Sequence, residues 1–561
     1  MMTLAGFLDE RRLMYGPWKA FERDVARLLI VNGFDEVRVV GGSGDRGADV
    51  LGVKNGQLWV WQCKHTTTSS PPKNAVGEVV EAARYYQADR MVVATSRPPG
   101  AGMLEEKARF ERQGLKIELA PPSVLLKRMK SSPEYPRSRR TLRDYQEEAS
   151  SRFREALTDT GRGQIVLATG LGKTIVMAEV VADLYRDGLI ADRRALVLAH
   201  TRELVDQLHK AFWHQLSSWV PTHQFAEGER PAYWDGITFA TIQSVVSCLD
   251  DLPTLGLVLV DEAHHVGADM FRRAIDALEP PMLGGVTATP WRGDAFDIDE
   301  ILGQPLVRIG IAEGLQRGFL SEVDYRLLAD NLDWKFVQEA STHKYSISHL
   351  NRKLIIPTRD EQAARVIKTA FESEGRRAAI LFSPTIAHAK SMAAMLRRYG
   401  VKTEPIYGEM PARERDRLMS RFKAGQLDVL TSVDLFNEGV DVPDVDLIIF
   451  MRATHSRRIF VQQLGRGLRV SPIKQNVIVL DFVTDIRRIA EVIELDRATR
   501  GGPMERLGLG SRIVQFSDAS AGGFLQEWLL DQASLFLREG DPVLELPKFE
   551  FPEPAPPGNV Q

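Results

Sequence analysis

The chain has 561 residues, enough for several domains that each bury an apolar core. Its formal net charge of -3 predicts no bulk attraction to nucleic acid, so any basic surface must be local. The two cysteines, Cys63 and Cys248, exclude a disulfide framework and a four-cysteine zinc site, and they favour a cytoplasmic protein. We find neither a signal-peptide pattern nor an apolar run long enough to span a membrane.

The first 130 residues alternate helical and strand patterns. Early in this block, the segment "AFERDVARLLI" places apolar residues at helical spacing, with Glu22 beside the apolar stripe. The strand-like segments on both sides of Asn55-Gly56 predict a hairpin with a two-residue turn. In that register Asp49 faces Gln62, and Lys64 lies on the same side of the hairpin. The other side carries core residues, which are Val50, Trp59, Trp61 and Cys63.

This polar cluster suits phosphodiester cleavage, because a carboxylate can bind Mg²⁺ and a nearby lysine can orient water. The stretch from Gly42 to Val50 reads "GSGDRGADV" and resembles the signature of the Mrr-like branch of the PD-(D/E)xK nucleases. The resemblance implies a Mg²⁺-dependent endonuclease at residues 1–130, with Asp49 as metal ligand. Its catalytic residues would be Glu22, Asp49, Gln62 and Lys64.

Gln62 stands where Asp or Glu is more usual in the superfamily, which predicts a modest metal affinity. Asp45 is interpreted as a turn residue. The alternative is a nuclease fold that only binds DNA.

Residues 131–140 are rich in Pro, Ser and Arg and are expected to form an exposed basic linker. Short apolar strands then alternate with helical patterns, which is typical of parallel α/β domains. We expect one such domain at 141–325 and a second at 366–490. Residues 326–365 would connect them, and 491–561 would form a C-terminal extension with a Pro-rich tail.

In the first of these domains, "QIVLATGLGKT" is a strand that runs into a glycine-rich turn, which is typical of a phosphate-binding loop. Lys173 would neutralise phosphate charge and Thr174 would hold Mg²⁺. Leu167 departs from the general pattern, which begins with Gly. The predicted ATP-binding residues of the loop are Thr169, Gly170, Gly172, Lys173 and Thr174.

The strand "LGLVLVDEAHH" ends in acidic residues. Asp261 would reach Mg²⁺ and Glu262 would polarise the attacking water. His264 would either relay between the nucleotide and nucleic-acid sites or only pack.

These segments, together with "TLRDYQEEA", "LAHTRELVDQ", "FATIQS", "TATP", "LFSPT", "LTSVDLFNEGVDVP" and "QQLGRGLR", resemble the ordered motifs of superfamily 2 helicases. The resemblance implies arginine fingers at Arg466 and Arg469. It assigns further ATP contacts to Arg143, Gln146, Gly439, Asp441 and Gln462. It assigns nucleic-acid contacts to Thr201, Arg202, Thr241, Gln243, Ser383, Thr385 and Thr431. Hydroxyl residues cap helices equally well, so each such contact also has a structural interpretation.

The expected fold is therefore α/β, with a restriction-endonuclease-like domain followed by two RecA-like parallel-sheet domains. We expect ATP and Mg²⁺ as cofactors and DNA as partner, in restriction, defence or repair. The rival interpretations are a DNA motor whose N-terminal domain does not cut and an RNA helicase. The sequence does not indicate the oligomeric state.

Overall fold

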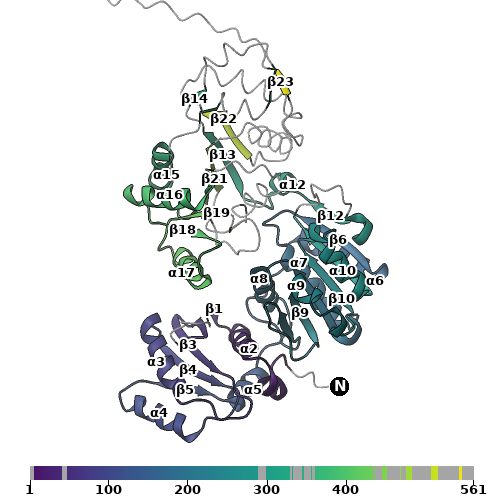
Figure 1. Cartoon of the computed structure of the whole chain (residues 1–561), viewed down its shortest axis with the longest axis vertical. Coiled ribbons are helices and arrows are strands. Elements are labelled where there is room, and N and C mark those ends of the chain that lie inside the picture. Colours follow the sequence, from purple (N-terminus) through teal and green to yellow (C-terminus); the bar gives the residue numbers. More distant parts are fainter. Residues whose placement is uncertain are drawn as a thin grey trace, which may run out of the picture. The chain divides into compact units, whose positions relative to one another are not determined.

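The computed structural model of the chain describes residues 6–40, 47–288, 298–328, 360–433, 445–451 and 476–482, with short pieces elsewhere. Within these residues lie three larger sheets, of five, seven and seven strands (Figure 1). Met1–Leu167 and Gly172–Arg308 form one compact unit, which contains the first two sheets, and a second unit includes Ile309–Gln561. The predicted α/β class, with one small domain ahead of two parallel-sheet domains, is confirmed.

The N-terminal sheet has a simple sequential order, and its hairpin has the predicted register. Asn55 and Gly56 both have positive φ, 52° and 74°, as the two-residue turn requires. Val50 then pairs with Trp61, which sets Asp49 against Gln62. In sheet order the strands are β1 (Asp35–Val39), β2 (Val50–Lys54), β3 (Gln57–Lys64), β4 (Arg90–Thr95) and β5 (Ile117–Ala120).

Helices cover both faces of this sheet, because strand residues alternate between them. One face packs Val50 and Trp61 against α2 (Trp18–Val31), and the other packs Leu51 and Val60 against α3 (Ala75–Tyr86). Trp213 belongs to the same apolar cluster as α2 and comes from the first of the two helicase-like parallel-sheet domains, which we call the first and second motor domains after that resemblance. The remaining helices of this domain are α1 (Glu10–Tyr15), α4 (Ala101–Glu111) and α5 (Pro122–Lys130).

The first motor domain is built on a sheet whose strands β6, β11, β10, β7, β9 and β8 pair in parallel. In sheet order the strands are β12 (Pro305–Ile309), β6 (Arg162–Leu167), β11 (Met282–Thr287), β10 (Leu257–Asp261), β7 (Arg194–Ala199), β9 (Gly236–Thr241) and β8 (Thr222–Phe225). The α-helices are α6 (Asp144–Asp159), α7 (Lys173–Arg186), α8 (Arg202–Trp213), α9 (Ile242–Val246), α10 (Asp269–Leu278) and α11 (Asp299–Leu302), and the short 3₁₀ turns are η1 (Ala191–Arg193), η2 (Leu249–Asp251) and η3 (Ala263–His265).

The second motor domain has a sheet of its own, with strands β18 (Thr403–Tyr407), β19 (Val429–Val433), β17 (Ala379–Phe382), β20 (Leu447–Phe450), β21 (Asn476–Phe482), β13 (Glu322–Leu328) and β22 (Leu507–Gln515). Its helices are α15 (Asp360–Glu374), α16 (Ile386–Arg398) and α17 (Ala412–Lys423), and α12 (Ile311–Gln316) precedes β13. Two small pairs join β14 (Asn331–Leu332) to β16 (Ile355–Ile356) and β15 (Lys344–Ser346) to β23 (Val543–Glu545).

Two expected boundaries differ from the structure. β13 pairs with β21 and β22, so residues 322–325 belong to the second motor sheet rather than to the first domain. The strand β22 also brings part of the expected C-terminal extension into that sheet. Segment patterns identify strands, but they do not say which sheet a strand joins.

The linker at 131–140 is mostly exposed, as expected, yet it is anchored to the first motor domain. Ser138 Oγ lies 2.6 Å from His214 Nδ1, and the Arg139 guanidinium pairs with Glu179 at 2.6 Å. The amide of Arg140 donates to Gln215 Oε1 at 2.9 Å. These contacts tie the N-terminal domain to the motor through more than a flexible tether.

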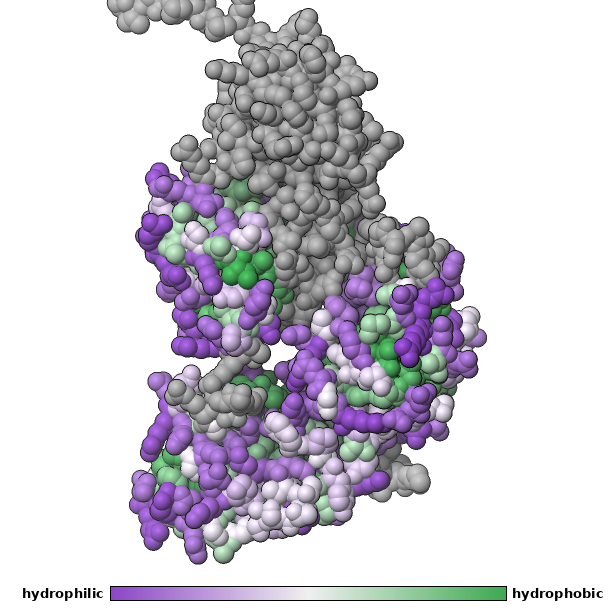
Figure 2. Space-filling view, viewed as in Figure 1, coloured by the Kyte–Doolittle hydropathy of each residue, from purple (hydrophilic) through white to green (hydrophobic). Residues whose placement is uncertain are grey.

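On the face drawn in Figure 2, hydrophilic residues cover most of the described surface and hydrophobic residues form small separate spots. Among the helices that the structure describes, none combines the length and apolar character needed to cross a bilayer.

Candidate ATP-hydrolysis and nuclease sites

The glycine-rich turn between β6 and α7 has the backbone of a phosphate-binding loop. Gly170 and Gly172 have φ values of 95° and 84°, a region that side chains disfavour. Gly172 is the N-cap of α7, so the backbone amides at this helix end and Lys173 lie where an anion is favoured. Leu167, at the position where the general pattern has Gly, is a fully buried residue of β6 and fills the core.

Gln146 brings the segment "TLRDYQEEA", with its predicted ATP contacts Arg143 and Gln146, to this loop. A Cβ atom at Gly172 would lie 2.5 Å from Gln146 Nε2, so Gln146 packs closely against this glycine, which its positive φ favours. The Gln146 Oε1 atom accepts from the amide of Arg143 at 3.0 Å, which closes a capping box at the start of α6. The cap therefore holds the side-chain amide of Gln146 against the phosphate loop.

The acidic pair lies at the end of β10, beside the same loop. Lys173 Nζ is 3.7 Å from Glu262 Oε1. Burial, together with the adjacent charge of Glu262, raises the pKa of Asp261 to about 7. Glu262 has a left-handed backbone, with φ 53° and ψ 56°, a strained geometry that often marks functional residues.

Asp261 and Thr174 have the chemistry that a magnesium–nucleotide complex requires, because carboxylate and hydroxyl oxygens are the ligands that Mg²⁺ prefers. A cation would favour the ionised form of the buried Asp261 carboxyl. The donor set of this loop therefore fits ATP with Mg²⁺.

His264 is fully buried and contacts Thr287 and Glu262. Its Nδ1 atom lies 3.0 Å from Thr287 Oγ1, in the "TATP" segment, and 3.3 Å from Glu262 Oε2. Thr287 ends β11, while residues 289 and 290 of the segment lie outside the described residues. Both interpretations of His264 stay open, because a buried imidazole needs polar partners whether it relays a signal or only packs.

Sequence analysis missed a row of adjacent histidine rings, tilted by about 42–43° to one another, that continues from His264. The ring of His265 lies 4.3 Å from that of His264, and the ring of His200 lies 4.8 Å from that of His265. His200 directly precedes Thr201, a predicted nucleic-acid contact. The repeated His in "DEAHH" and the His in "LAHT" were the available signals, but only the fold places the two segments side by side.

The predicted nucleic-acid contacts of the first motor domain lie at helix starts. Thr201 and Thr241 are the N-caps of α8 and α9, and their hydroxyls accept from Leu204 and Ser244 amides at 3.3 and 3.4 Å. Arg202 pairs with Glu227. The side-chain amide of Gln243 donates to the His200 carbonyl at 3.4 Å. As phosphate contacts these residues remain predictions.

In the second motor domain the three hydroxyl residues have structural roles. Thr385 is the N-cap of α16 and accepts from the His388 amide at 3.1 Å. Ser383 and Thr431 are fully buried, and Thr431 donates to the Ala389 carbonyl at 2.8 Å. As nucleic-acid contacts, Ser383, Thr385 and Thr431 stay predictions. The other predicted residues of this domain, which are Gly439, Asp441, Gln462, Arg466 and Arg469, lie outside the described residues.

In the N-terminal domain, the hairpin gathers the predicted nuclease residues. Asp49 and Gln62 are both buried, and Asp49 Oδ2 accepts from the Cys63 amide at 2.6 Å. Gln62 Oε1 is buried without a hydrogen-bond partner among the described residues. A buried carbonyl oxygen without a partner beside a carboxylate fits a divalent cation. Asp45 and the rest of residues 41–46 lie outside the described residues.

Glu22 approaches this cluster from α2. It is buried, and its charge acts on the Cys63 thiol together with that of Asp49. Burial first, and then these two carboxylates, raise the pKa of that thiol well above its usual range. The neighbouring Phe21 ring lies 5.9 Å from the His65 ring, which fixes the start of α2 over the end of β3. Both carboxylates therefore flank the same strand.

Lys64 is paired with a residue that the sequence analysis missed. Its Nζ atom lies 2.7 Å from Glu78 Oε2, on α3. Gly47 lets α3 approach the hairpin closely, because a Cβ atom at this position would lie 2.4 Å from the Glu78 carbonyl oxygen. Within the described residues no three His, Cys, Asp or Glu side chains are arranged to hold a metal. A site that uses Gln62 in place of a third carboxylate is consistent with that finding.

Comparison with known families assigns each of these regions. A restriction endonuclease profile matches residues 15–122, a profile described as "Type III restriction enzyme, res subunit" matches 139–292, and the helicase conserved C-terminal domain matches 361–471. The chain thus combines a region similar to restriction endonucleases with two regions similar to the res subunit of type III restriction enzymes and to the helicase C-terminal domain.

Several curated proteins are similar to part of the chain. IRC3 of Saccharomyces cerevisiae, named as an ATP-dependent helicase, is 25% identical over 374 residues, 64% of this chain and 53% of IRC3. The DNA 3'-5' translocase XPB2 of Sulfurisphaera tokodaii is 26% identical, over 58% of this chain and 78% of XPB2. The EcoKI endonuclease subunit of Escherichia coli, a type I restriction enzyme, is 25% identical, over 59% of this chain and 33% of the subunit. The chain spans 53% to 63% of the length of the first three relatives.

Among solved structures, the DNA-bound ATP-dependent Type ISP restriction-modification enzyme LlaBIII shares the fold. The likeness covers 92% of this chain and 41% of that enzyme, with a TM-score of 0.50 and 17% identity.

Proposed function

We propose that this protein is an ATP-driven DNA translocase that carries a Mg²⁺-dependent endonuclease and acts in restriction or a related defence or repair process. The ATP-driven motor is supported by one observation: Glu262 and Asp261, at the end of β10, lie close to Lys173 of the phosphate-binding loop. The nuclease half is supported by the cluster of Asp49, Gln62 and Lys64 on one hairpin.

In the motor, Lys173 and the amides around Gly172 hold the β- and γ-phosphates. Thr174 and Asp261 would hold Mg²⁺, which would supply positive charge to the phosphates when bound. Glu262 orients the attacking water and accepts its proton as the water oxygen bonds to the γ-phosphorus. The bond to the β–γ bridging oxygen breaks, and ADP leaves with the negative charge. His264 reports this change to Thr287 through its imidazole.

In the nuclease, Asp49 and the Gln62 carbonyl would hold Mg²⁺, which supplies Lewis acidity to the scissile phosphate when bound. Lys64 places positive charge beside the pentavalent phosphorus, and Glu22 orients the neighbouring water. The pair with Glu78 holds the ammonium of Lys64 in place before DNA arrives.

Two assays on the same DNA substrates test this proposal. ATP turnover should be stimulated by DNA and lost in Lys173→Ala, and Mg²⁺-dependent nicking of plasmid should be lost in Lys64→Ala. Stimulation by RNA alone would replace the DNA motor with an RNA helicase. Equal nicking by the parental protein and Lys64→Ala would overturn the assigned nuclease site, and no nicking by the parental protein would leave an N-terminal domain that only binds DNA.

A further inference from the structure

Helix α2 carries a predicted nuclease residue and also contacts the first motor domain. Glu22, the predicted nuclease residue, is followed directly by Arg23, which pairs with Glu229 of the first motor domain. The pair is bidentate, with a second bond from Arg23 Nη1 to Glu229 Oε2 at 3.2 Å. Both side chains are about one-tenth exposed, 10% for Arg23 and 9% for Glu229. The residue next to the nuclease carboxylate is therefore held by the motor.

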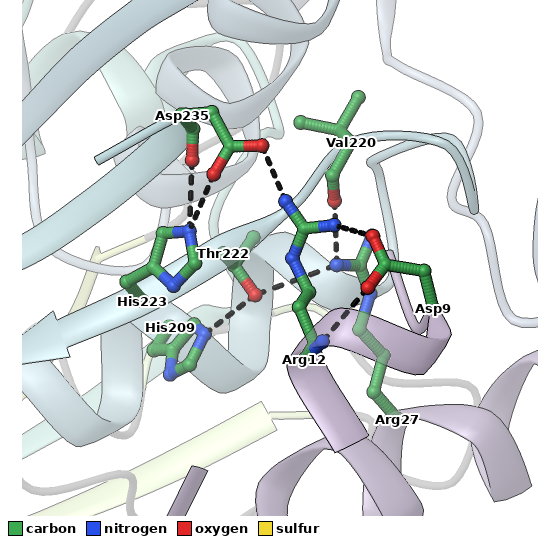
Figure 3. Close-up of polar contacts among 8 residues, drawn as sticks. All are labelled: Asp9, Arg12, Arg27, His209, Val220, Thr222, His223 and Asp235. Atoms are coloured by element: carbon green, nitrogen blue, oxygen red, sulfur yellow. Dashed lines mark hydrogen bonds and ion pairs between the residues drawn. The ribbon is translucent and has the colours of Figure 1, made fainter. Parts of the chain in front are cut away.

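One turn further along α2, Arg27 makes a second connection (Figure 3). It is fully buried, and its guanidinium donates to the carbonyls of Val220 at 2.7 Å and Ser217 at 3.0 Å. Its Nη1 atom also lies 3.4 Å from Thr222 Oγ1, which is 2.7 Å from His209 Nε2. Arg27 thus reaches β8 and, through Thr222, α8.

Helix α1 supplies the third connection. Arg12 bonds Asp9, the N-cap of α1, and also Asp235 of the motor domain (Figure 3). His223 donates to the Asp235 backbone carbonyl at 2.8 Å and lies 3.6 Å from its carboxylate. Although burial opposes it, the bonds from His223 and Arg12 hold the pKa of Asp235 well below its usual range. Asp235 is thus charged and bound on two sides.

Charged pairs are a costly way to build a stable contact, because desolvation offsets much of their attraction. Their geometry is directional, however, so they fix register and orientation better than apolar packing does. Three arginines from the first 27 residues each meet the motor through a defined set of oxygens. Such an interface suits a domain whose orientation matters.

The motor side of the Arg23 pair leads directly to a predicted DNA contact. Glu229 closes a tight turn with Ala226, to whose carbonyl its amide donates at 3.0 Å. Glu227, with φ 48°, and Gly228, with φ 78°, form the centre of the turn. Glu227 pairs with Arg202 at the start of α8. One short turn therefore holds Arg202 by one carboxylate and Arg23 by another.

We propose that Arg23 and Arg27 are positioning residues, which clamp α2 to the first motor domain and so fix the endonuclease site relative to the Arg202 end of α8. This inference rests on the proposed function. A DNA strand bound at Arg202 would then be presented to the nuclease cluster at a constant offset. Rigid docking of the endonuclease domain on the motor would couple cutting to translocation. A flexible tether would not hold the nuclease site at a fixed distance from the bound DNA.

The test compares Arg23→Glu, Glu229→Arg and the double charge exchange in the full chain. ATP-dependent cleavage of long duplex DNA should fall at least about tenfold in each single variant and recover in the double variant, since only the exchange restores the pair. ATP turnover and ATP-independent nicking of short oligonucleotides should stay within about twofold, since neither active site is altered. Arg230→Glu is the matched control, because its pair with Asp251 is exposed and lies on the motor alone.

The outcomes separate the two proposals. If the parental protein neither hydrolyses ATP nor cuts DNA, the proposed function fails. If it does both and ATP-dependent cleavage is unchanged in Arg23→Glu, only the positioning role fails. Should Arg23→Glu be insoluble, Glu229→Gln decides: unchanged coupled cleavage in that variant overturns the proposal, and a loss that leaves ATP turnover intact supports it.

Discussion

The Nζ atom of Lys173 lies 3.7 Å from Oε1 of Glu262, so the predicted phosphate-binding lysine and the predicted catalytic base form an ion pair. When ATP binds, Lys173 would pair with the γ-phosphate instead of Glu262, and the Glu262 carboxylate would then be available to bind the attacking water. We expect Glu262→Gln to bind ATP normally but to lower kcat by about 10²–10⁴-fold, the usual worth of a positioned base. Lys173→Ala should lose nucleotide binding as well, which fluorescent-nucleotide titration would measure.

The contact of His264 with Thr287 predicts a loss of communication rather than of chemistry. Thr287→Val keeps the shape of the side chain but removes the hydroxyl that His264 contacts at 3.0 Å. Basal ATP turnover should change little, while stimulation by DNA should fall several-fold. Combining Thr287→Val with His200→Ala tests whether the row of histidines carries the signal. If the two residues acted independently, their effects on stimulation by DNA would simply add.

At the nuclease site, the buried Oε1 atom of Gln62 predicts what a carboxylate at this position would do. Gln62→Glu places a carboxylate where a buried carbonyl has no partner among the described residues. Divalent cation affinity should rise several-fold, because ligand charge tunes such sites. Calorimetric titration with Mn²⁺ measures this without reference to cleavage. An unchanged affinity would mean that Gln62 is not a metal ligand.

Glu78 should act through Lys64. Lys64→Ala is expected to lower nicking by about 10²-fold or more, as the loss of a charge at the phosphorus does elsewhere. Glu78→Gln retains a hydrogen-bond acceptor for the ammonium, so its effect should be smaller, about tenfold or less. Plasmid nicking at saturating Mg²⁺ compares the two, and a larger loss in Glu78→Gln would make Glu78 the more direct participant.

Asp24, on α2 at the docking interface, predicts a pH effect on stability. Burial raises its pKa to about 7, against the charges of Arg12, Arg23 and Arg27. Between the ordinary pKa of 3.8 and the folded-state pKa of about 7, the folded state binds more protons at Asp24 than the unfolded state does. The contribution of this carboxyl to the free energy of unfolding therefore falls as the pH rises through this range and is lowest above it. Melting temperatures at pH 5 and pH 8 should therefore differ less in Asp24→Asn than in the parental protein. An identical pH dependence in both would remove Asp24 as the cause.

Local chemistry predicted much of both sites. The Asn55-Gly56 turn set the register that pairs Asp49 with Gln62, because a two-residue turn leaves one alignment. The strand-to-glycine pattern likewise located Lys173 and the acidic pair. These are short-range features, in which spacing along the chain determines spacing in the fold.

The features that sequence analysis missed depend on contacts between distant segments. Glu78 reaches Lys64 only because α3 packs behind Gly47, and Arg27 reaches Val220 across 193 positions of the sequence. The sheet to which β13 belongs is set by pairing with β21, which lies about 150 residues later. No periodicity within one segment encodes such partners.

The most direct test of the whole account is plasmid cleavage with ATP and Mg²⁺ by the parental protein, Lys173→Ala and Lys64→Ala. We predict that Lys64→Ala hydrolyses ATP but does not cut, and that Lys173→Ala loses ATP turnover together with ATP-dependent cutting. Cleavage by both variants at the parental rate would contradict the claim that a DNA motor and an endonuclease work together in this chain.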